Sequence, residues 1–434
     1  MARCRTTLGV LSVVALAGAT AAADDRAVPL TSAEWRPSPA PFELHWELLD
    51  LPGRVVELAL TPLRPIFEIV EQKRLDRRIY DLVSNEAKTA FLLPYVTVGG
   101  SDGVAGGLLF MHNDLFGEDE RLRLSGALRG NLDYKVKATY EQAVARLDGR
   151  TVGARISYDH DTDWTYHGLG GDAPEDVERA VRSDELLVTL RGQLLGPELL
   201  YVSSDLVLTY RRQSLGPGDS PDVPALRRSD PEVAPLPGFE QTLDLPELGL
   251  TLTFDSRDSL GRTTRGFLAR LEVAGTRDLN GASLSAFRAA LDTSLFLEVL
   301  PRARVIVLSA GIGAATPWQS EHELPLRGYI SLGRETHLRG YRRDRFLDRF
   351  GWWASAEYRY PVFEHERDEL GLSSVLFFDL GRAGADAHGL FGLAPRWSAG
   401  FGVQADTAIS PLLRLLVGFS PEGSEVTFSV GSLL

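Results

Sequence analysis

The chain has 434 residues, of which 44% are hydrophobic and 24% charged, and its formal net charge is −13. This length suits two or three soluble domains or one large barrel, and such an acidic chain is a poor candidate for binding nucleic acid. Beyond the first 25 residues, no window holds the run of about 18 apolar residues that a membrane-spanning helix needs. A helical membrane protein is therefore excluded. A membrane β-barrel is not, because its strands alternate in hydropathy.

The first 23 residues have the pattern of a secretory signal peptide. Two arginines precede an apolar run, and three alanines at 21–23 follow it as a cleavage site. The single cysteine, Cys4, comes before the apolar run, where it serves neither as a lipid anchor nor, after cleavage, in a disulfide. We therefore expect an exported protein whose stability comes from burial and from hydrogen-bonded closure.

Two short regions follow the predicted signal peptide. Residues 24–50 are rich in proline, alanine and acids and are predicted to be extended or disordered. Over residues 51–90 the apolar spacing becomes helical, with Ile66, Ile69 and Val70 beside a charged run. This pattern predicts one or two amphipathic helices, whose apolar side has to be buried against another part of the protein.

From residue 91 onward the apolar period changes to two. Leu248, Leu250 and Leu252, for example, alternate with Thr251 and Thr253. Such alternation gives a strand one apolar and one polar face. About sixteen strands are predicted in this way, near 92–99, 104–112, 121–129, 132–143, 150–162, 183–194, 199–212, 246–256, 264–276, 283–297, 302–314, 351–361, 371–380, 395–405, 411–419 and 424–432.

The long connections between these predicted strands all fall on one side of the sheet. They span 163–182, 213–245, 315–350 and 381–394. Short turns on one side and long loops on the other are typical of outer-membrane barrels, and an even strand count lets such a sheet close. The predicted fold is an all-β membrane protein, a 16-stranded antiparallel transmembrane β-barrel over 91–434, in the outer membrane of a Gram-negative bacterium. A soluble all-β protein is the weaker alternative.

The sixth extracellular connection contains the stretch "ETHLRGYRRDRF", residues 335–346. Its charge is what a solvated surface loop carries, and this is our expectation for Arg342, Arg343 and Arg345. Whether Arg339 also points into water depends on what surrounds it.

Two carboxylates on neighbouring predicted strands are expected to point into the barrel. Glu357 alternates with Ala356 and Tyr358, and Asp379 alternates with Phe378. The lipid-compatible residues take the outer face, so both acids face inward. Confined carboxylates repel each other and favour a cation, and an arginine offers a planar fork that bonds both.

Several motifs resemble the bacterial surface antigen superfamily, which includes the barrels of BamA, TamA and the two-partner-secretion transporters. "SLGRETHLRGY" resembles the sixth-loop signature, "ASAEYRYPV" supplies an acid on the next strand, and "LFFDLGRAG" supplies a Phe-x-Asp-x-Gly pattern on the strand after it. "FDSRD" followed by "RGF" resembles the mid-barrel hairpin. The residues concerned are Arg339, Gly340, Tyr341, Glu357, Phe377, Asp379 and Gly381 around the loop, and Asp255, Arg257, Asp258 and Gly266 in the hairpin.

The resemblance implies that the sixth loop folds back into the lumen and forms a latch, in which Arg339 meets Glu357 and Asp379. Gly340 would then allow a tight turn at the loop tip, and Tyr341 would pack on the barrel wall.

The chain departs from the superfamily pattern in front of the barrel and in its last strand. Transporters of the superfamily usually carry polypeptide-transport-associated domains before the barrel, and residues 24–90 are too short and too helical for one. The last strand ends in Leu434, where such barrels commonly have an aromatic residue. The first strand contains Pro94, which cannot donate to a ladder, and the last contains Gly431. Either these residues weaken the seam between the two strands, or Pro94 only marks a strand start.

No catalytic site is expected. The segment "YDHDTDW" holds Asp159, His160, Asp161 and Asp163, but wet acids are normal at an extracellular strand end, and no second histidine cluster supports a metal site. There is no nucleophile elbow. We expect neither a cofactor nor a metal.

Three functions remain open at this point. The first is an insertase or translocase of polypeptide or lipid that works through a lateral seam, as the resemblance implies. The second is a passive outer-membrane pore, and the third is a structural or surface-interaction barrel. A meeting of Arg339 with two acids favours the first, and the missing periplasmic domains favour the others. The expected partners are outer-membrane lipid and polypeptide clients or a periplasmic partner, and not nucleic acid.

Overall fold

The computed structural model describes residues 83–98, 104–117, 120–144, 150–196, 201–300, 304–333, 337–364, 371–392, 394–406 and 411–430. The predictions for the signal peptide at 1–23, the segment 24–50 and the helices at 51–82 lie outside these residues, as do Gly431 and Leu434. The chain divides into two compact units, Met1–Lys88 and Thr89–Leu434, and the second is described below. Within the described residues, no helix is both long and apolar enough to cross a membrane.

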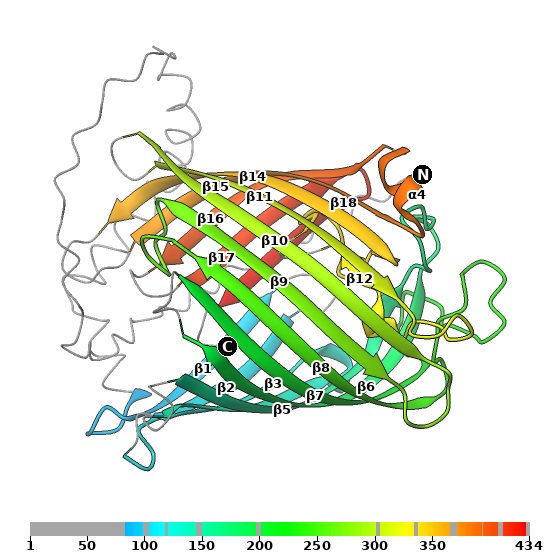
Figure 1. Ribbon diagram of the computed structural model, residues 1–434, viewed down its shortest axis with the longest axis horizontal. Coiled ribbons are helices and arrows are strands. Elements are labelled where there is room, and N and C mark those ends of the chain that lie inside the picture. The colour runs from blue at the N-terminus through cyan, green and yellow to red at the C-terminus, as the bar shows by residue number, and fades with distance from the viewer. Residues whose placement is uncertain are drawn as a thin grey trace. The chain divides into compact units, whose positions relative to one another are not determined.

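Sixteen strands form one antiparallel sheet, in which each strand pairs with the next along the chain (Figure 1). The predicted all-β, sixteen-stranded antiparallel architecture is confirmed. The strands are β1 (Ala90–Val98), β2 (Val104–Asn113), β3 (Arg121–Leu128), β4 (Tyr134–Val144), β5 (Arg150–Tyr166), β6 (Arg179–Leu195), β7 (Val202–Pro217), β8 (Thr242–Asp255), β9 (Gly266–Arg277), β10 (Ser285–Leu300), β11 (Arg304–Thr316), β14 (Phe350–Glu364), β15 (Gly371–Gly384), β16 (Arg396–Asp406), β17 (Pro411–Ser420) and β18 (Gly423–Val430). Shorter elements are η2 (Gly130–Leu132), η4 (Leu326–Gly328), β12 (Ile330–Leu332), β13 (Phe346–Asp348) and α4 (Ala387–Gly392).

The register separates an outer from an inner wall of the barrel. Leu124, Ala138 and Ile156 lie side by side on β3, β4 and β5, and the two larger side chains are 41% and 50% exposed. One residue away, Arg123 and Arg155 flank β4 on the opposite face. Exposed apolar residues therefore cover the outside, and charged residues face the lumen, as in a membrane barrel with a polar interior.

β1 and β18 are the two edges of the sheet. Within the described residues, β1 pairs only with β2 and β18 only with β17, although the two edge strands lie near each other. The expected closure by a continuous ladder is therefore not observed. Pro94 lies inside β1, opposite Leu108, so the interpretation that it marks a strand start is wrong. A proline inside a strand is tolerated at an edge, because the missing N–H can face away from the neighbour.

Some strands run further on the long-loop side than the alternation predicted. β6 begins at Arg179 and β7 ends at Pro217. The connection between β7 and β8 bridges to Ala180 and Leu215 in these extensions, and an apolar cluster buries Leu215 with Phe239. Packing of the loop, which hydropathy alternation does not report, holds these strand ends.

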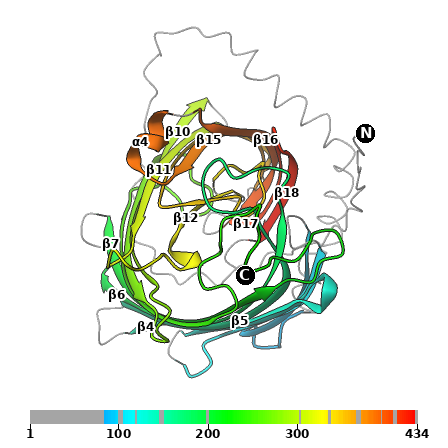
Figure 2. The ribbon, with the colours of Figure 1, turned by 90° about the vertical axis from the view of Figure 1, so that its right-hand side faces the viewer.

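The connection between β11 and β14, residues 317–349, is called loop 6 below. It contains the two-stranded sheet of β12 and β13, which pairs Ile330 with Asp348 and Leu332 with Phe346. Figure 2 looks along the barrel and shows β12 within the ring of strands. Loop 6 thus returns into the lumen.

Candidate functional site

Glu357 and Asp379 project from neighbouring strands of the wall that loop 6 meets. On β14 and β15, Ser355 pairs with Asp379 and Glu357 with Phe377, so all four side chains share the inner face. The alternation of each strand therefore brings the two acids together, with Ser355 beside them. Both carboxylates are buried, at 6% and 1% exposure.

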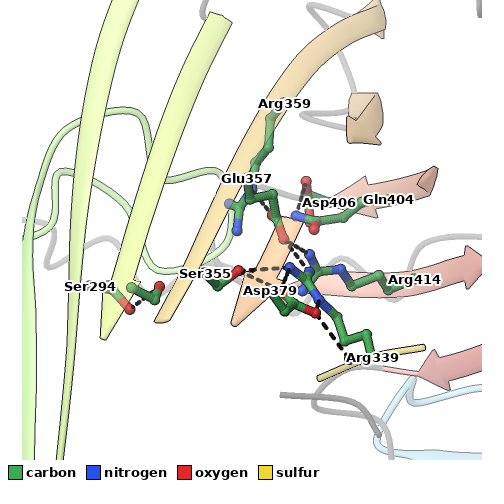
Figure 3. Close-up of polar contacts among 10 residues, drawn as sticks. Ser294, Arg339, Ser355, Glu357, Arg359, Asp379, Gln404, Asp406 and Arg414 are labelled. Carbon is green, nitrogen blue, oxygen red and sulfur yellow. Dashed lines mark hydrogen bonds and ion pairs between the residues drawn. The ribbon is translucent and has the colours of Figure 1, made fainter. Parts of the chain in front are cut away.

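Arg339 of loop 6 contacts both carboxylates (Figure 3). Its Nη1 lies 2.6 Å from Glu357 Oε2, and its Nη2 and Nε lie 2.6 and 3.0 Å from the two oxygens of Asp379. Nη2 also donates to Ser355 Oγ at 2.8 Å. The guanidinium carbon lies 3.8 Å from the centre of the Phe377 ring. Arg339 itself is 3% exposed, so the site is a buried, charge-assisted network.

Glu357 holds two further cations. Arg359 Nε donates to its Oε1 at 2.7 Å, and Arg414 of β17 donates to Oε2. Three arginines therefore surround one carboxylate, which offsets the cost of burying its charge.

Asp379 depends more strongly on loop 6. Its other partners are neutral: Ser355 and Ser398 donate hydroxyl bonds at 2.8 and 3.1 Å, and the backbone N–H of Arg339 donates at 3.0 Å. Among the described residues, Arg339 is its only ion-pair partner. Removing that side chain would leave a buried carboxylate without a counter-charge.

The positive φ angles at the loop tip belong to residues other than Gly340. Leu338 has a φ of 55° and accepts a hydrogen bond from the N–H of Tyr341 at 3.0 Å, which makes the turn. Gly333 has a φ of 125°, and a Cβ there would lie 2.2 Å from the Arg342 carbonyl oxygen. Gly340 lies inside this turn, but it has no positive φ, so the turn itself does not require a glycine there.

Gly340 is needed for close approach. A Cβ at Gly340 would lie 2.7 Å from the Phe419 carbonyl of β17. A Cβ at Gly418, the preceding residue of β17, would lie 2.6 Å from the Arg339 carbonyl oxygen. Two glycines thus let the backbone of the loop lie directly against the backbone of the wall.

Tyr341 and Gly381 complete the contact with the wall. Tyr341 is 1% exposed and packs edge-on against Phe346, with ring centres 5.1 Å apart. It belongs to a buried cluster that includes Leu338 and Trp353 of β14. A Cβ at Gly381 would meet the Leu338 side chain at 3.4 Å, so the glycine leaves room for the loop.

Arg345 lies in a second buried contact of loop 6. The expectation that it is solvated is wrong, because its side chain is 1% exposed. Its Nε and Nη2 lie 2.6 and 2.9 Å from the two oxygens of Glu422, in the turn between β17 and β18, and Nη2 also donates to the Ala173 carbonyl at 2.9 Å. Arg342 and Arg343 remain partly exposed, at 43% and 36%. No sequence signal separates Arg345 from these two neighbours.

The chain from Asn113 to Gly431 matches the family model of the Omp85 superfamily domain. The chain belongs to the Omp85 superfamily. The resemblance to BamA-like barrels is thereby confirmed, and the family points to the outer membrane of Gram-negative bacteria.

Two solved structures share the barrel of this Omp85 chain. The crystal structure of BamA from Haemophilus ducreyi lacking POTRA domains 1–3 is 16% identical with a TM-score of 0.53, and the match covers 79% of this chain and 70% of that one. CdiB from Escherichia coli is 14% identical with a TM-score of 0.51, over 79% of this chain and 62% of that one. At these identities the likeness concerns the fold alone. Comparison with curated protein sequences gave no match.

The hairpin motif of this Omp85 barrel forms the turn between β8 and β9, away from Arg339 in the chain and in the sheet. Arg257 bonds Asp255 through Nε and Nη2 at 2.8 and 2.7 Å. Asp258 accepts bonds from the backbone N–H groups of Thr264 and Arg265. A Cβ at Gly266, whose φ is 122°, would lie 2.5 Å from a backbone oxygen. These contacts order the turn and offer no chemistry.

Loop 6 is also held by the connection between β5 and β6, residues 167–178. Gly170 N–H donates to the Leu347 carbonyl at 2.8 Å. His167 is 2% exposed, and its Nε2 lies 3.5 Å from Glu178 Oε1. Burial lowers the pKa of His167 below its ordinary value, against the opposing effect of Glu178. The hydrogen bond from His167 in turn lowers the pKa of Glu178. A neutral imidazole beside a carboxylate is therefore the stable state near neutral pH.

The acidic segment at 159–163 is divided among several partners. Asp159 bonds Arg129 and Lys135, and His160 Nδ1 lies 2.5 Å from Asp184. Asp161 and Asp163 come near Asp133. The four residues therefore do not converge on one point.

Proposed function

We propose that this Omp85 barrel assists the insertion or translocation of polypeptide, or of lipid, through a lateral seam between β1 and β18, while loop 6 is latched in the lumen. The observation that carries the proposal is the buried contact of Arg339 with Glu357 and Asp379. A passive pore needs no arginine buried against two wall carboxylates, since lumen-facing groups of a wet channel are solvated.

The edges of the sheet support the seam. β1 contains Pro94, which lacks the N–H that a ladder requires, and β18 has eight residues in the part of the chain that the structure describes. Opening between two edges that share no continuous ladder breaks few backbone hydrogen bonds. Opening between neighbours such as β10 and β11 breaks a continuous ladder.

Disulfide crosslinking across the seam tests the proposal. In a Cys4→Ser background, Thr97→Cys on β1 is combined in turn with Thr427→Cys and Ser429→Cys on β18. The control pairs Thr97→Cys with Ala105→Cys, which are register partners on β1 and β2. Each variant replaces the native protein in a depletion strain, and the outer-membrane proteome and lipids are compared before and after reduction.

We expect a seam crosslink to produce the depletion phenotype and reduction to reverse it, while the β1–β2 control behaves as wild type. Normal outer-membrane composition with a completely crosslinked seam would rule out lateral opening and would favour the passive pore or the structural barrel.

A further inference from the structure

The turn between β8 and β9, residues 256–265, reaches a distant part of the barrel wall. A Cβ at Gly371, the first residue of β15, would lie 2.6 Å from Arg262 Nη2. β15 is four places from β9 in the sheet, and neighbouring strands are about 4.8 Å apart, so about 19 Å of wall separates the two strands. The turn therefore does not continue the line of its own strands but bends over towards β15.

The inner face of the wall receives this turn. Gly371 alternates onto the same face of β15 as Asp379, and Asp406 of β16 is its register partner. A cavity of about 20 Å³, enough for one water molecule, lies between turn and wall. Thr263 of the turn is 4% exposed and Asp406 is 3% exposed, so the turn covers the wall inside the lumen. The cavity is lined by Arg262, Thr263, Thr264, Val305, Arg359, Pro361, Ser373 and Asp406.

The β8–β9 turn keeps its shape through its own hydrogen bonds. Thr263 Oγ1 donates to the Ser259 carbonyl at 2.6 Å, and the N–H of Arg262 donates to Ser259 Oγ at 3.2 Å. Asp258 adds the backbone contacts described above. Because these bonds lie within the turn, they are kept when it leaves the wall. The turn can therefore seat and unseat as one unit.

An acid of the wall favours the seated turn. Asp406 accepts hydrogen bonds from Gln404 Nε2 at 2.8 and 2.9 Å, and this donor is uncharged. The charges of Arg262 on the turn and of Arg359 and Arg414 on the wall act on the same carboxylate. A buried acid attracts nearby cations strongly, so Asp406 stabilises Arg262 against the wall.

Arg359 connects this seat with that of loop 6. It lines the cavity under the turn, and its Nε donates to Glu357 Oε1 at 2.7 Å. The other oxygen of Glu357 lies 2.6 Å from Arg339 Nη1. Figure 3 shows Glu357 between Arg359 and Arg339. One buried carboxylate thus links a loop that enters from the long-loop end of the barrel with a turn that enters from the other end.

We propose that the β8–β9 turn is a second latch, which narrows the short-turn end of the lumen and whose seating is coupled to that of loop 6 through Arg359 and Glu357. A molecule that enters the lumen at this end has to displace the turn. Arg359 then loses a neighbour on one side and changes its hold on Glu357 on the other. Contiguous contacts carry coupling of this kind, and the coupling is reciprocal. The inference goes beyond the seam and does not depend on it.

The labelling rate of a cysteine in the turn tests the proposal. Thr263→Cys is introduced into the full chain with Cys4→Ser, purified in lipid nanodiscs and treated with a water-soluble maleimide, which reaches this buried position only when the turn is unseated. Arg262→Ala removes the cation that faces the wall. Arg265→Ala, which removes a 58% exposed cation from the same turn, is the matched control. Arg339→Ala releases loop 6.

We expect Arg262→Ala to raise the labelling rate about tenfold, as the loss of a charged contact implies, and Arg265→Ala to change it by less than about twofold. Arg339→Ala should raise it about fivefold, which is the lower range of coupling between sites. Asp406→Asn should act in the same direction as Arg262→Ala, and it replaces that variant if the gel band shift shows Arg262→Ala to be unfolded.

Equal labelling rates in Arg262→Ala and Arg265→Ala would overturn the latch. An unchanged rate in Arg339→Ala would overturn the coupling. So would an equal rise at Thr139→Cys, a position on β4 that is 8% exposed, because the barrel would then be loosened as a whole. The assay needs no seam, so its failure is distinct from a failure of lateral opening.

Discussion

Arg339→Ala tests the latch through the unequal positions of the two carboxylates. Breaking a buried ion pair by removing one partner costs about 3–5 kcal/mol. Glu357 would keep Arg359 and Arg414, whereas Asp379, which is 1% exposed, would keep only neutral donors. Most of the cost should therefore arise at Asp379.

This asymmetry predicts which second substitution rescues the first. Asp379→Asn in the Arg339→Ala background removes the uncompensated charge and should recover about 1–3 kcal/mol, the usual cost of an unsatisfied buried group. Glu357→Gln in the same background should recover nothing, because it takes a partner from Arg359 and Arg414.

The midpoint temperature of the gel band shift measures these effects on the purified barrel. At roughly 2 °C per kcal/mol for a large chain, Arg339→Ala should lower the midpoint by about 5–10 °C, and loop 6 should become protease-sensitive. Arg343→Ala, a partly exposed neighbour, is the control and should change little. An unchanged midpoint in Arg339→Ala, or rescue by Glu357→Gln equal to that by Asp379→Asn, would refute the reasoning.

Three further predictions concern other contacts of loop 6. Gly340→Ala should displace the loop from the wall and lower the same midpoint, because the new Cβ meets backbone at 2.7 Å, whereas Gly106→Ala, where nothing lies within 4 Å, should not; equal midpoints would contradict the close approach. Arg345→Ala should lower the free energy of unfolding by about 3–5 kcal/mol, and Glu422→Gln should lower it less, because the amide still accepts a hydrogen bond from Arg345. Protease mapping of loop 6 checks both variants, and full protection of loop 6 in Arg345→Ala would count against the contact of Arg345 with Glu422. The pKa of His167 is depressed in the folded barrel, so the folded barrel is destabilised relative to the unfolded chain as pH falls below the ordinary His pKa of about 6.5. The midpoint temperature of the wild-type barrel should therefore fall between about pH 7.5 and 5, and that of His167→Gln should fall less. Identical pH dependence of the two midpoints would contradict this.

The barrel is predictable from the sequence because its constraints are periodic. A strand between lipid and lumen has to alternate, and the same alternation fixes which way Glu357 and Asp379 point. Alternation predicts β6 and β7 to be shorter than they are, because their extensions pack against a loop and have no alternation of lipid-facing and lumen-facing residues.

Non-periodic contacts in loop 6 were not predictable. Arg345 carries the same charge as Arg342 and Arg343, and its burial comes from the β17–β18 turn and the β5–β6 connection, which both contact it. The loop motif indicated that a glycine is needed at position 340. The physical reason for this glycine was not predictable, because it is a close backbone approach to Phe419, a residue far along the chain.

The contacts of Arg339 also bear on the order in which the barrel is completed. Its side-chain partners, Ser355, Glu357 and Asp379, all follow it in the chain, and its backbone rests on Gly418 of β17. Each of these contacts has to offset the loop-closure entropy of the chain between its partners. Loop 6 is thus synthesised before the residues that receive Arg339, and the complete seat requires strands up to β17.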